Sequence, residues 1–237
     1  MGSPFLTAEW RDIVMLNYEV SPDILRGRVP RGTELDQFQG KTLVSVVGFR
    51  FLKTTVRGLP IPWHQDFEEV NLRFYVRSQR DPERRGVVFV KEIVPHAAVT
   101  WVARTLYHEN YHTHPMRRSA SDASGDLLHS YAFDAGGRAH ELRATTDGAP
   151  QALGAGSESE FIAEHYYGYC KRRDGATFEY RVDHPPWHVH AVRDAALDFD
   201  VAAVYGAEWS SALRGAPCSA LVAIGSAVSV AAPVRLE

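Results

Sequence analysis

Lysine is scarce in this chain of 237 residues, although basic side chains in general are not. Lysine and arginine together number 26, yet lysine occurs only at positions 41, 53, 91 and 171. A lysine amine becomes a nucleophile only where its surroundings lower its pKa. Any reaction that proceeds through a lysine adduct therefore has very few candidate residues here.

Cysteine and long apolar runs are also lacking. Cys170 and Cys218 are far apart and belong to no CxxC pair, which fits a reducing compartment better than a disulfide scaffold. The opening "MGSPFLTAEW" has no charged segment followed by an apolar one, as a signal peptide would. No stretch reaches the roughly 18 apolar residues that a membrane helix needs. We expect a soluble cytoplasmic protein without a membrane partner.

An excess of charge of either sign is missing as well. The formal net charge is −3 and the isoelectric point about 6.4, and acids alternate with bases along the chain. The chain lacks the cluster of basic residues that nucleic-acid-binding proteins carry, so we expect no nucleic-acid partner. Hydrophobic residues make up 45% of the chain, enough to bury a core without disulfides, and we expect one domain over residues 1–237.

Most of the chain has the pattern of β-strands. Residues 68–79, "EEVNLRFYVRSQ", alternate apolar and polar side chains with a period of two, and residues 87–94 form a second strand after the turn "DPERRG". Residues 41–56 are rich in valine, phenylalanine and threonine, which predicts a further, half-buried strand. Two further hairpins are expected around "DAGG" and around "DG". They lie in "LLHSYAFDAGGRAHELRATTDG" and in "ESEFIAEHYYGYCKRRDGATFEYRV".

Helical and C-terminal segments complete the pattern. Pro95 opens a helix that we expect to end near Asn110, because Pro115 favours an extended residue before it. The C-terminal "CSALVAIGSAVSVAAPVRL" predicts a buried strand, a turn at Gly225-Ser226 and an edge strand. Such an edge could pair with a second copy, which would give a homo-oligomer. Many strands with few helices predict a β-rich α+β fold, built on a curved sheet or β-barrel.

A polar row lies on one side of the strand at residues 68–79. Glu69, Asn71, Arg73 and Tyr75 alternate with apolar residues and therefore share one face. In water the row would be an ordinary solvated sheet face, but inside a barrel it would orient a ligand. There Glu69 could act as a general acid or base, and Arg73 could bind a carboxylate.

Histidines gather in "LYHENYHTHPM" and "DHPPWHVH". His188 and His190 would share one face of a strand and could bind zinc. His112 would join His114 if that segment is extended, or His108 if it is helical. All of them lie near the ends of predicted elements, where polar residues are common, so we expect no metal cofactor and keep zinc as the weaker alternative.

Other candidates have a structural and a functional interpretation. Tyr107 and Tyr111 are core aromatics or pocket hydroxyls. Arg50 is an exposed arginine or a contact for a carboxylate. The segment from His184 to Trp187, "HPPW", is a rigid corner that ends a strand, or else a pocket wall.

Several motifs, in their order along the chain, carry a resemblance. They are "FQGKTLVSVVGF", "GLPIP", "EEVNLRFYVR", "ARTLYHENYHTHPM" and "HPPW". Together they resemble the YqjF-like family of uncharacterised bacterial proteins, known as DUF2071, from about Leu16 to Arg235. The resemblance implies a fold similar to acetoacetate decarboxylase, with a mostly apolar pocket. It brings no established activity with it.

Acetoacetate decarboxylase works through a Schiff-base lysine, so the resemblance can be tested on the lysines. Where it places the lysine pair, after the helix, this chain has Tyr111 and His112. Lys91 lies on the preceding strand and is not adjacent in sequence. We therefore expect no decarboxylase of the imine type.

These features predict a pocket enzyme that acts on a small organic acid or carbonyl compound. The alternatives are a non-catalytic protein that binds an apolar or amphiphilic ligand and, less favoured, a zinc-dependent hydrolase. The expected catalytic residues are Glu69, Arg73 and Tyr111. The expected ligand-binding residues are Arg50, Asn71, Tyr107, His112, His184 and Trp187.

Overall fold

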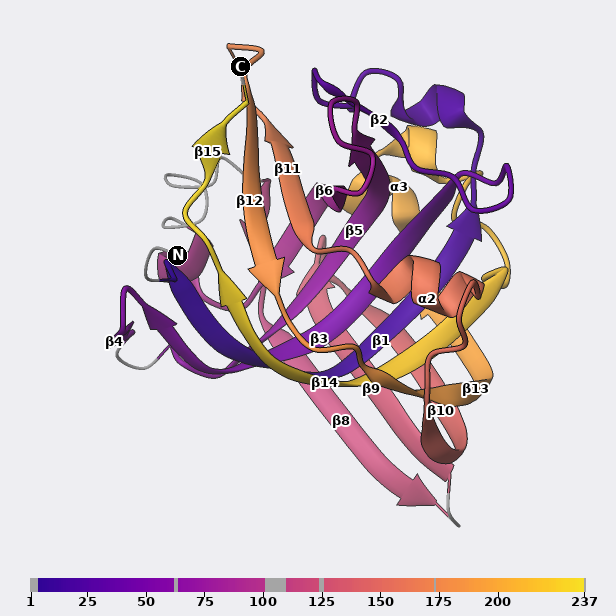
Figure 1. The fold of residues 1–237 in the computed structure, drawn as a ribbon. Coiled ribbons are helices and arrows are strands. Elements are labelled where there is room, and N and C mark those ends of the chain that lie inside the picture. Colours follow the sequence, from indigo (N-terminus) through magenta and orange to yellow (C-terminus); the bar gives the residue numbers. More distant parts are fainter. Residues whose placement is uncertain (1–3, 62–63, 101–109, 124–125, 173, 237) are drawn as a thin grey trace.

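A computed structural model describes residues 4–61, 64–100, 110–123, 126–172 and 174–236 of the chain. Strands dominate, and all of the strands in the described residues join one sheet (Figure 1). The strands are β1 (Leu6–Glu19), β2 (Thr33–Leu35), β3 (Leu43–Val56), β4 (Leu59–Pro60), β5 (Phe67–Ser78), β6 (Arg85–Val94), β7 (Tyr111–Thr113), β8 (Met116–Ala123), β9 (Asp126–Ala135), β10 (Arg138–Ala152), β11 (Tyr167–Lys171), β12 (Thr177–Asp183), β13 (His188–Asp198), β14 (Ser219–Val230) and β15 (Val234–Arg235).

Part of the sheet closes on itself. The order β14-β1-β3-β5-β6-β11-β12 continues from β12 back to β14, where Val182 pairs with Val230. Within this closed part, neighbouring strands are antiparallel except β6 and β11, which run parallel. The closed part therefore encloses an interior onto which one face of each of its strands points.

Bulges bend the long strands around this interior. In β1 the register shifts between Arg11 and Val14, and Asp12 has a φ of 55°. In β3, Lys53 has a φ of 54° beside a second shift. Extra residues of this kind increase strand twist and redirect the side chains that follow.

Beyond β14, the sheet continues as β13-β10-β9-β8 and projects from the closed part (Figure 1). This extension packs across the outer face of β1 and β3. Gly48 allows the close approach, because a Cβ atom there would lie 2.7 Å from Leu142 and 2.8 Å from Tyr131. The large hydrophobic core lies in this layer.

Short helices cover the ends of the sheet. They are η1 (Pro22–Leu25), α2 (Glu158–Ala163), α3 (Val201–Tyr205) and η2 (Ala207–Trp209). In α2 the Ser157 side chain caps the helix by accepting a hydrogen bond from the Glu160 amide. The buried Phe161 and Ile162 of α2 contact the second hydrophobic core.

Most predicted strands are confirmed. The expected hairpin at 68–79 and 87–94 is β5 and β6, and the expected strand at 41–56 is β3. Both "DAGG" and "DG" connect antiparallel partners. The curved, strand-rich fold class is likewise as expected.

Two details were wrong. Residues Glu158–Ala163 form α2 and not a strand, because Ser157 supplies a helix cap. The expected turn at Gly225-Ser226 does not exist, because β14 pairs with β1 without interruption from Ser219 to Val230. Gly225 instead has a φ of 80° and approaches Trp10, where a Cβ would lie 2.0 Å from its carbonyl oxygen.

The second error removes the edge strand from which a homo-oligomer was predicted. β14 lies between β1 and the strands β13 and β12 and is not an edge. The ends of the strand order are β15 and β8. A homo-oligomer stays a prediction without that support.

The predicted helix after Pro95 is only partly within the described residues. Residues 97–100 are helical, and by Asn110 the helix has ended. Residues 101–109, and with them Tyr107 and His108, lie outside the described residues.

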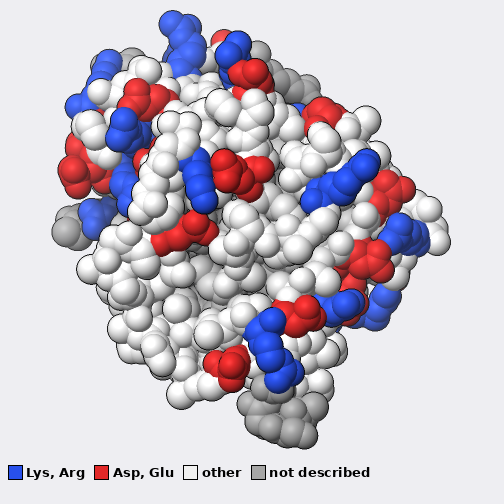
Figure 2. Space-filling model, turned by 90° about the vertical axis from the view of Figure 1, so that its right-hand side faces the viewer, with Lys and Arg blue, Asp and Glu red and all other residues white. Residues whose placement is uncertain are grey.

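Figure 2 shows acidic and basic side chains side by side on one face of the molecule, without a field of one sign. Among the helices of the described ranges, none is both long and apolar enough to cross a bilayer.

Candidate functional site

The interior of the closed sheet contains a cavity. Its volume is about 140 Å³, counted as the space open to the centre of a water molecule. Its walls come from β1, β3, β5, β6, β11, β12 and β14, and most of them are apolar. The polar or amphipathic side chains in the wall are Trp10, Thr54, Glu69, Asn71, Arg73, Glu92, Tyr111, His165, Tyr167, Tyr180 and Trp187.

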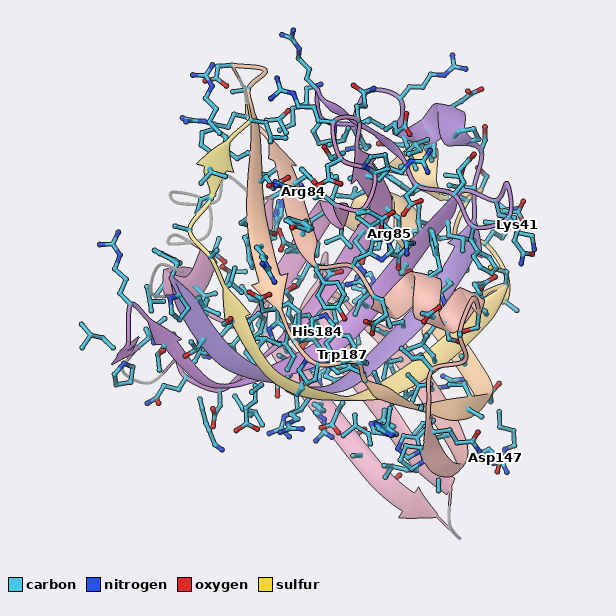
Figure 3. The ribbon with its side chains drawn as sticks, viewed as in Figure 1. Lys41, Arg84, Arg85, Asp147, His184 and Trp187 are labelled. Atoms are coloured by element: carbon cyan, nitrogen blue, oxygen red, sulfur yellow. The ribbon has the colours of Figure 1, made fainter. Side chains whose placement is uncertain are left out.

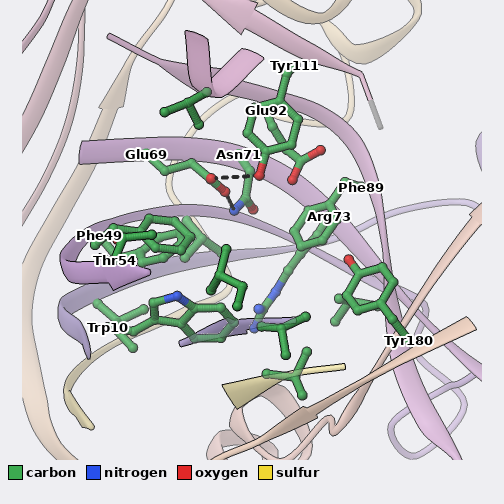
Figure 4. A pocket seen from close by; sticks show the side chains of 18 of the residues that line it. Trp10, Phe49, Thr54, Glu69, Asn71, Arg73, Phe89, Glu92, Tyr111 and Tyr180 are labelled. Atoms are coloured by element: carbon green, nitrogen blue, oxygen red, sulfur yellow. Dashed lines mark hydrogen bonds between the residues drawn. The ribbon is translucent and has the colours of Figure 1, made fainter. Parts of the chain in front are cut away.

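Strand alternation brings the acidic end of the cavity together. Glu69 of β5 pairs with Phe49, and Asn71 pairs with Glu92 of β6. Glu92 in turn pairs with Tyr111 of β7. Because side chains of paired residues lie on the same face of a sheet, all of them point into the cavity (Figure 4).

Glu69 is the central group of this end. Its side chain is 1% exposed, and it accepts hydrogen bonds from Asn71 Nδ2 at 2.8 Å and from the Tyr111 hydroxyl at 3.0 Å. Burial raises the pKa of Glu69 to about 7, although both hydrogen bonds and the charge of Arg73 act to lower it. Near neutral pH this carboxyl therefore exists in both protonation states, as a general acid or base requires.

Arg73 carries the positive charge of the cavity. Its Nη2 donates to the Ile162 carbonyl of α2 at 3.1 Å and lies 3.5 Å from the Met15 sulfur. Among the described residues, no carboxylate lies within 4 Å of its guanidinium, and its buried Nε has no hydrogen-bond partner. A charge held this way in an apolar wall is costly unless a counter-ion joins it.

His165 lies at the α2 end of the cavity, and the Tyr75 and His165 ring centroids are 4.7 Å apart. Its Nε2 lies 3.5 Å from Asp36 Oδ2, which also accepts a 2.6 Å hydrogen bond from Arg85. Burial lowers the pKa of His165 to about 4, so the ring is neutral at pH 7. Its Nδ1 is buried and has no partner among the described residues.

Several buried polar atoms of the cavity wall are without hydrogen-bond partners in the part of the chain that the structure describes. Trp10 Nε1 and Arg73 Nε are donors, Asn71 Oδ1 is an acceptor, and Thr54 Oγ1 can be either. Leaving such atoms unsatisfied costs about 1–3 kcal/mol each, so a partly polar occupant of the cavity would be stabilising.

The cavity itself is costly to keep empty. At about 24 cal/mol per Å³, an empty space of 140 Å³ corresponds to about 3 kcal/mol of lost packing. Larger side chains could have filled it, for example at Val47 or Val87. A void lined by buried polar atoms that have no partner among the described residues suits a partly polar ligand.

The structure brings together five of the predicted site residues. Glu69, Asn71, Arg73, Tyr111 and Trp187 all line the cavity. The polar row on β5 faces the interior of the closed sheet and is therefore not a solvated sheet face. Trp187 is 4% exposed, donates from Nε1 to Ser226 at 2.9 Å, and is both corner and pocket wall.

Two predicted residues lie elsewhere for reasons of strand geometry. Arg50 pairs with Glu68, so it lies on the opposite face of β3 from Phe49 and contacts Asp12 at 3.5 Å. His112 follows Tyr111 on β7 and faces away from the cavity, with its Nε2 3.0 Å from Asn110. Neither residue lines this cavity, and their predicted role in ligand binding stays a prediction.

His184 is near the cavity but not in its wall. It stacks on Trp187 with ring centroids 4.2 Å apart (Figure 3), and it lines a shallow groove together with Glu9, Lys53 and Asp183. Its predicted role as a contact for the pocket ligand is therefore not supported by its position.

The other histidines that the structure describes do not form a metal-binding group. His188 and His190 are on β13 as expected, and His190 Nδ1 lies 3.1 Å from the Gly148 carbonyl oxygen. His114 packs against Phe133. Across the described residues, no three histidine, cysteine or acidic side chains are placed to share a metal ion.

All four lysines are described, and each has its amine outside the cavity. Lys91 pairs with Leu72, on the other face of the sheet from Asn71, and donates to the Val204 carbonyl at 2.6 Å. Burial lowers the pKa of Lys91. Lys41 lies beside Glu19, Lys53 beside Glu9, and Lys171 beside the Gly27 carbonyl.

The sequence did not single out six polar or amphipathic residues of the wall, namely Trp10, Thr54, Glu92, His165, Tyr167 and Tyr180. Glu92 could have been found from the sequence, because it is the acid in the apolar strand "VVFVKEIV". In the structure its side chain is 1% exposed. Thr54 points inward only because a bulge precedes it. No signal in the sequence marks Trp10 or His165.

Comparison with known proteins adds the family. Residues 7–227 match the model of DUF2071, described as an uncharacterised conserved protein. The chain belongs to the DUF2071 family. The uncharacterised protein YqjF of Bacillus subtilis (strain 168) is 29% identical over 185 residues, covering 75% of this chain and 72% of that protein.

Solved structures establish the fold of this DUF2071 protein. Acetoacetate decarboxylase from Legionella pneumophila superposes with a TM-score of 0.69 at 14% identity, over 100% of this chain and 88% of that one. The enduracididine biosynthesis enzyme MppR, solved with pyruvate, superposes with a TM-score of 0.68 at 14% identity, over 100% of this chain and 92% of that one. The fold is acetoacetate decarboxylase-like, as the resemblance implied.

Proposed function

We propose that this DUF2071 protein is an enzyme that moves a proton at the carbon beside the carbonyl group of a small carboxylic acid. The observation that carries the proposal is Glu69, a buried carboxyl in a ligand-sized cavity whose pKa is raised to about 7. A general base works best when its pKa is near the operating pH. The guanidinium of Arg73, which has no carboxylate within 4 Å among the described residues, supports an acidic substrate.

Each cavity residue has a part in the proposed step. Arg73 holds the substrate carboxylate, and Glu69 takes the proton as the C–H bond breaks. The electron pair of that bond moves to the carbonyl oxygen. Thr54 Oγ1 and Trp10 Nε1, which have no partner in the described part of the chain, are available to donate hydrogen bonds to it. Asn71 and Tyr111 hold Glu69 in place.

We further propose that no lysine adduct takes part. A Schiff base needs an amine in the cavity, and the four lysine amines lie outside it. Structures under 25% identical share the fold alone, so the decarboxylase chemistry of the first comparison structure does not carry over. The pyruvate complex of MppR supports small oxo acids as the first compounds to test.

The experiment is deuterium exchange, followed by proton NMR in D₂O. Pyruvate, 2-oxobutanoate and acetoacetate would each be incubated with wild-type protein, the Glu69→Gln variant and the Glu68→Gln variant. Glu68 neighbours Glu69 on β5 but faces the other way, so it is the matched control. We expect exchange beside the carbonyl group with the wild type and Glu68→Gln, and its loss with Glu69→Gln.

Binding distinguishes the enzyme from a binding protein that uses the same cavity. If Glu69 is the base, Glu69→Gln loses exchange but still binds the acid. Binding of the acids by all three proteins without any exchange would refute catalysis and favour the non-catalytic alternative. The mostly apolar wall supports that alternative too, since it suits an apolar ligand.

A further inference from the structure

One side of the cavity is formed by a separate hydrophobic cluster. Its buried members are Phe5, Tyr180, Val182 and Val230, and Leu6, Trp10 and Val56 pack against them. All seven side chains line the cavity. We call these seven residues the apolar chamber.

The chamber is built by the closure of the sheet. Val182 of β12 and Val230 of β14 are the pair that joins the two strands. Tyr180 lies over Gly168 of the neighbouring strand, where a Cβ atom would come within 2.1 Å of its ring. Gly168 thus allows the Tyr180 ring to lie against β11, where it leaves the cavity open.

The volume of the cavity indicates the size of the group that fits. An apolar cavity of about 150 Å³ stays dry and holds one benzene molecule. Here 140 Å³ is available, and Phe5, Trp10 and Tyr180 supply ring faces or edges against which another ring can pack. Acids with only two to four carbon atoms would leave much of it empty.

A charge lies beside this apolar space. Figure 4 shows Arg73 between Trp10 and Tyr180, and all three line the same cavity. Glu69 and Asn71 lie at the other side in the same view. A ligand that fills the site must therefore combine an anionic head with an apolar body.

We infer that the substrate is a monocarboxylic acid that carries an aromatic ring, with the carboxylate at Arg73 and the ring in the apolar chamber. The inference rests on the proposed function, because it uses the same cavity and the same arginine. It adds the class of the substrate. Oxo acids without a ring would then exchange more slowly than oxo acids that carry one.

The test measures binding of three probes by isothermal titration calorimetry. Phenylacetate has both features, acetate lacks the ring, and phenylacetamide lacks the charge. Burial of a phenyl group predicts that phenylacetate binds at least about 30-fold more tightly than acetate. Loss of the charge predicts that phenylacetamide binds at least about tenfold more weakly than phenylacetate.

Variants locate the ring. Val230→Phe fills the chamber and is expected to weaken phenylacetate binding at least about tenfold while acetate binding stays within about twofold. Val234→Phe is the matched control, since Val234 is 58% exposed on β15 and is not in the cavity wall. If Val230→Phe does not fold, intermolecular NOEs in the wild type between the phenyl protons and the methyl groups of Val182 and Val230 replace it.

The outcomes separate the two claims. Equal affinity for phenylacetate and acetate, or an absence of those NOEs, overturns the ring inference and leaves the proposed function standing. Equal affinity for phenylacetate and phenylacetamide overturns the role of Arg73 and with it the acidic substrate of the proposed function. Failure of all three probes to bind overturns the inference as well.

Discussion

Replacement of Glu69 by glutamine should change how the stability of the protein depends on pH. A carboxyl with a raised pKa binds its proton more tightly in the folded state than in the unfolded state. The stabilising effect is complete below the unfolded pKa, about 4.5, and is lost as the pH rises through the folded value of about 7. Glutamine has nearly the same shape and does not titrate.

The size of the effect follows from the shift. Each pKa unit corresponds to about 1.4 kcal/mol, so the difference between 4.5 and about 7 amounts to about 3 kcal/mol. Between pH 4.5 and 8, the free energy of unfolding of the wild type should therefore fall by about 3 kcal/mol relative to Glu69→Gln. At pH 8 the variant should be at least as stable as the wild type.

The assay is urea unfolding at pH 4.5, 5.5, 6.5, 7.5 and 8, with free energies taken by linear extrapolation. Only the difference between the two proteins is used, because other groups titrate in both. Glu68→Gln keeps the buried carboxyl and is expected to follow the wild type. Parallel curves for wild type and Glu69→Gln would refute the reasoning.

Three further predictions concern other parts of the structure. Gly168→Ala should lower the free energy of unfolding by about 1–3 kcal/mol and weaken phenylacetate binding, because the new Cβ displaces the Tyr180 ring. At Gly27 a Cβ would meet no atom within 4 Å, so Gly27→Ala should change neither quantity in the same unfolding and calorimetric assays. His165 has a pKa lowered to about 4, so the folded state binds the proton of this ring less tightly than the unfolded state does. As the pH falls from 6.5 to 4, the free energy of unfolding of the wild type should fall by up to about 3 kcal/mol relative to His165→Asn. Equal acid unfolding curves would contradict this. Borohydride added with pyruvate or acetoacetate should leave the intact mass unchanged, and a reduced adduct on Lys91 or any other lysine would disprove the claim that no imine forms.

The strands were predictable because their signals are local. Alternation along residues 68–79 gave β5 and identified Glu69, Asn71 and Arg73 as one face. Whether that face points to water or to the interior depends on how the sheet closes. That closure depends on the pairing of Val182 with Val230. These two residues are far apart in the sequence, and no local pattern reveals that they pair.

The sequence could not predict positions where a single residue decides a register or a face. Position 112 is one step along β7 from Tyr111, and that step turns His112 away from the cavity. Arg50 is one step from Phe49 in the same way. The expected turn at Gly225 is part of strand β14, since a glycine with a positive φ can stand in a turn or within a strand. Thr54 and Glu92 are brought to the site by bulges in β3 and β6.

The protonation of Glu69 is the central claim, and it can be measured directly. Protein labelled with ¹³C at the glutamate side-chain carboxyl would be titrated by NMR, and the resonance absent from Glu69→Gln would be followed from pH 4 to 9. The structure predicts a pKa of about 7 for that resonance. A value near 4.5 would show that Glu69 is fully ionised at neutral pH, and would contradict its role as the acid and base of the cavity.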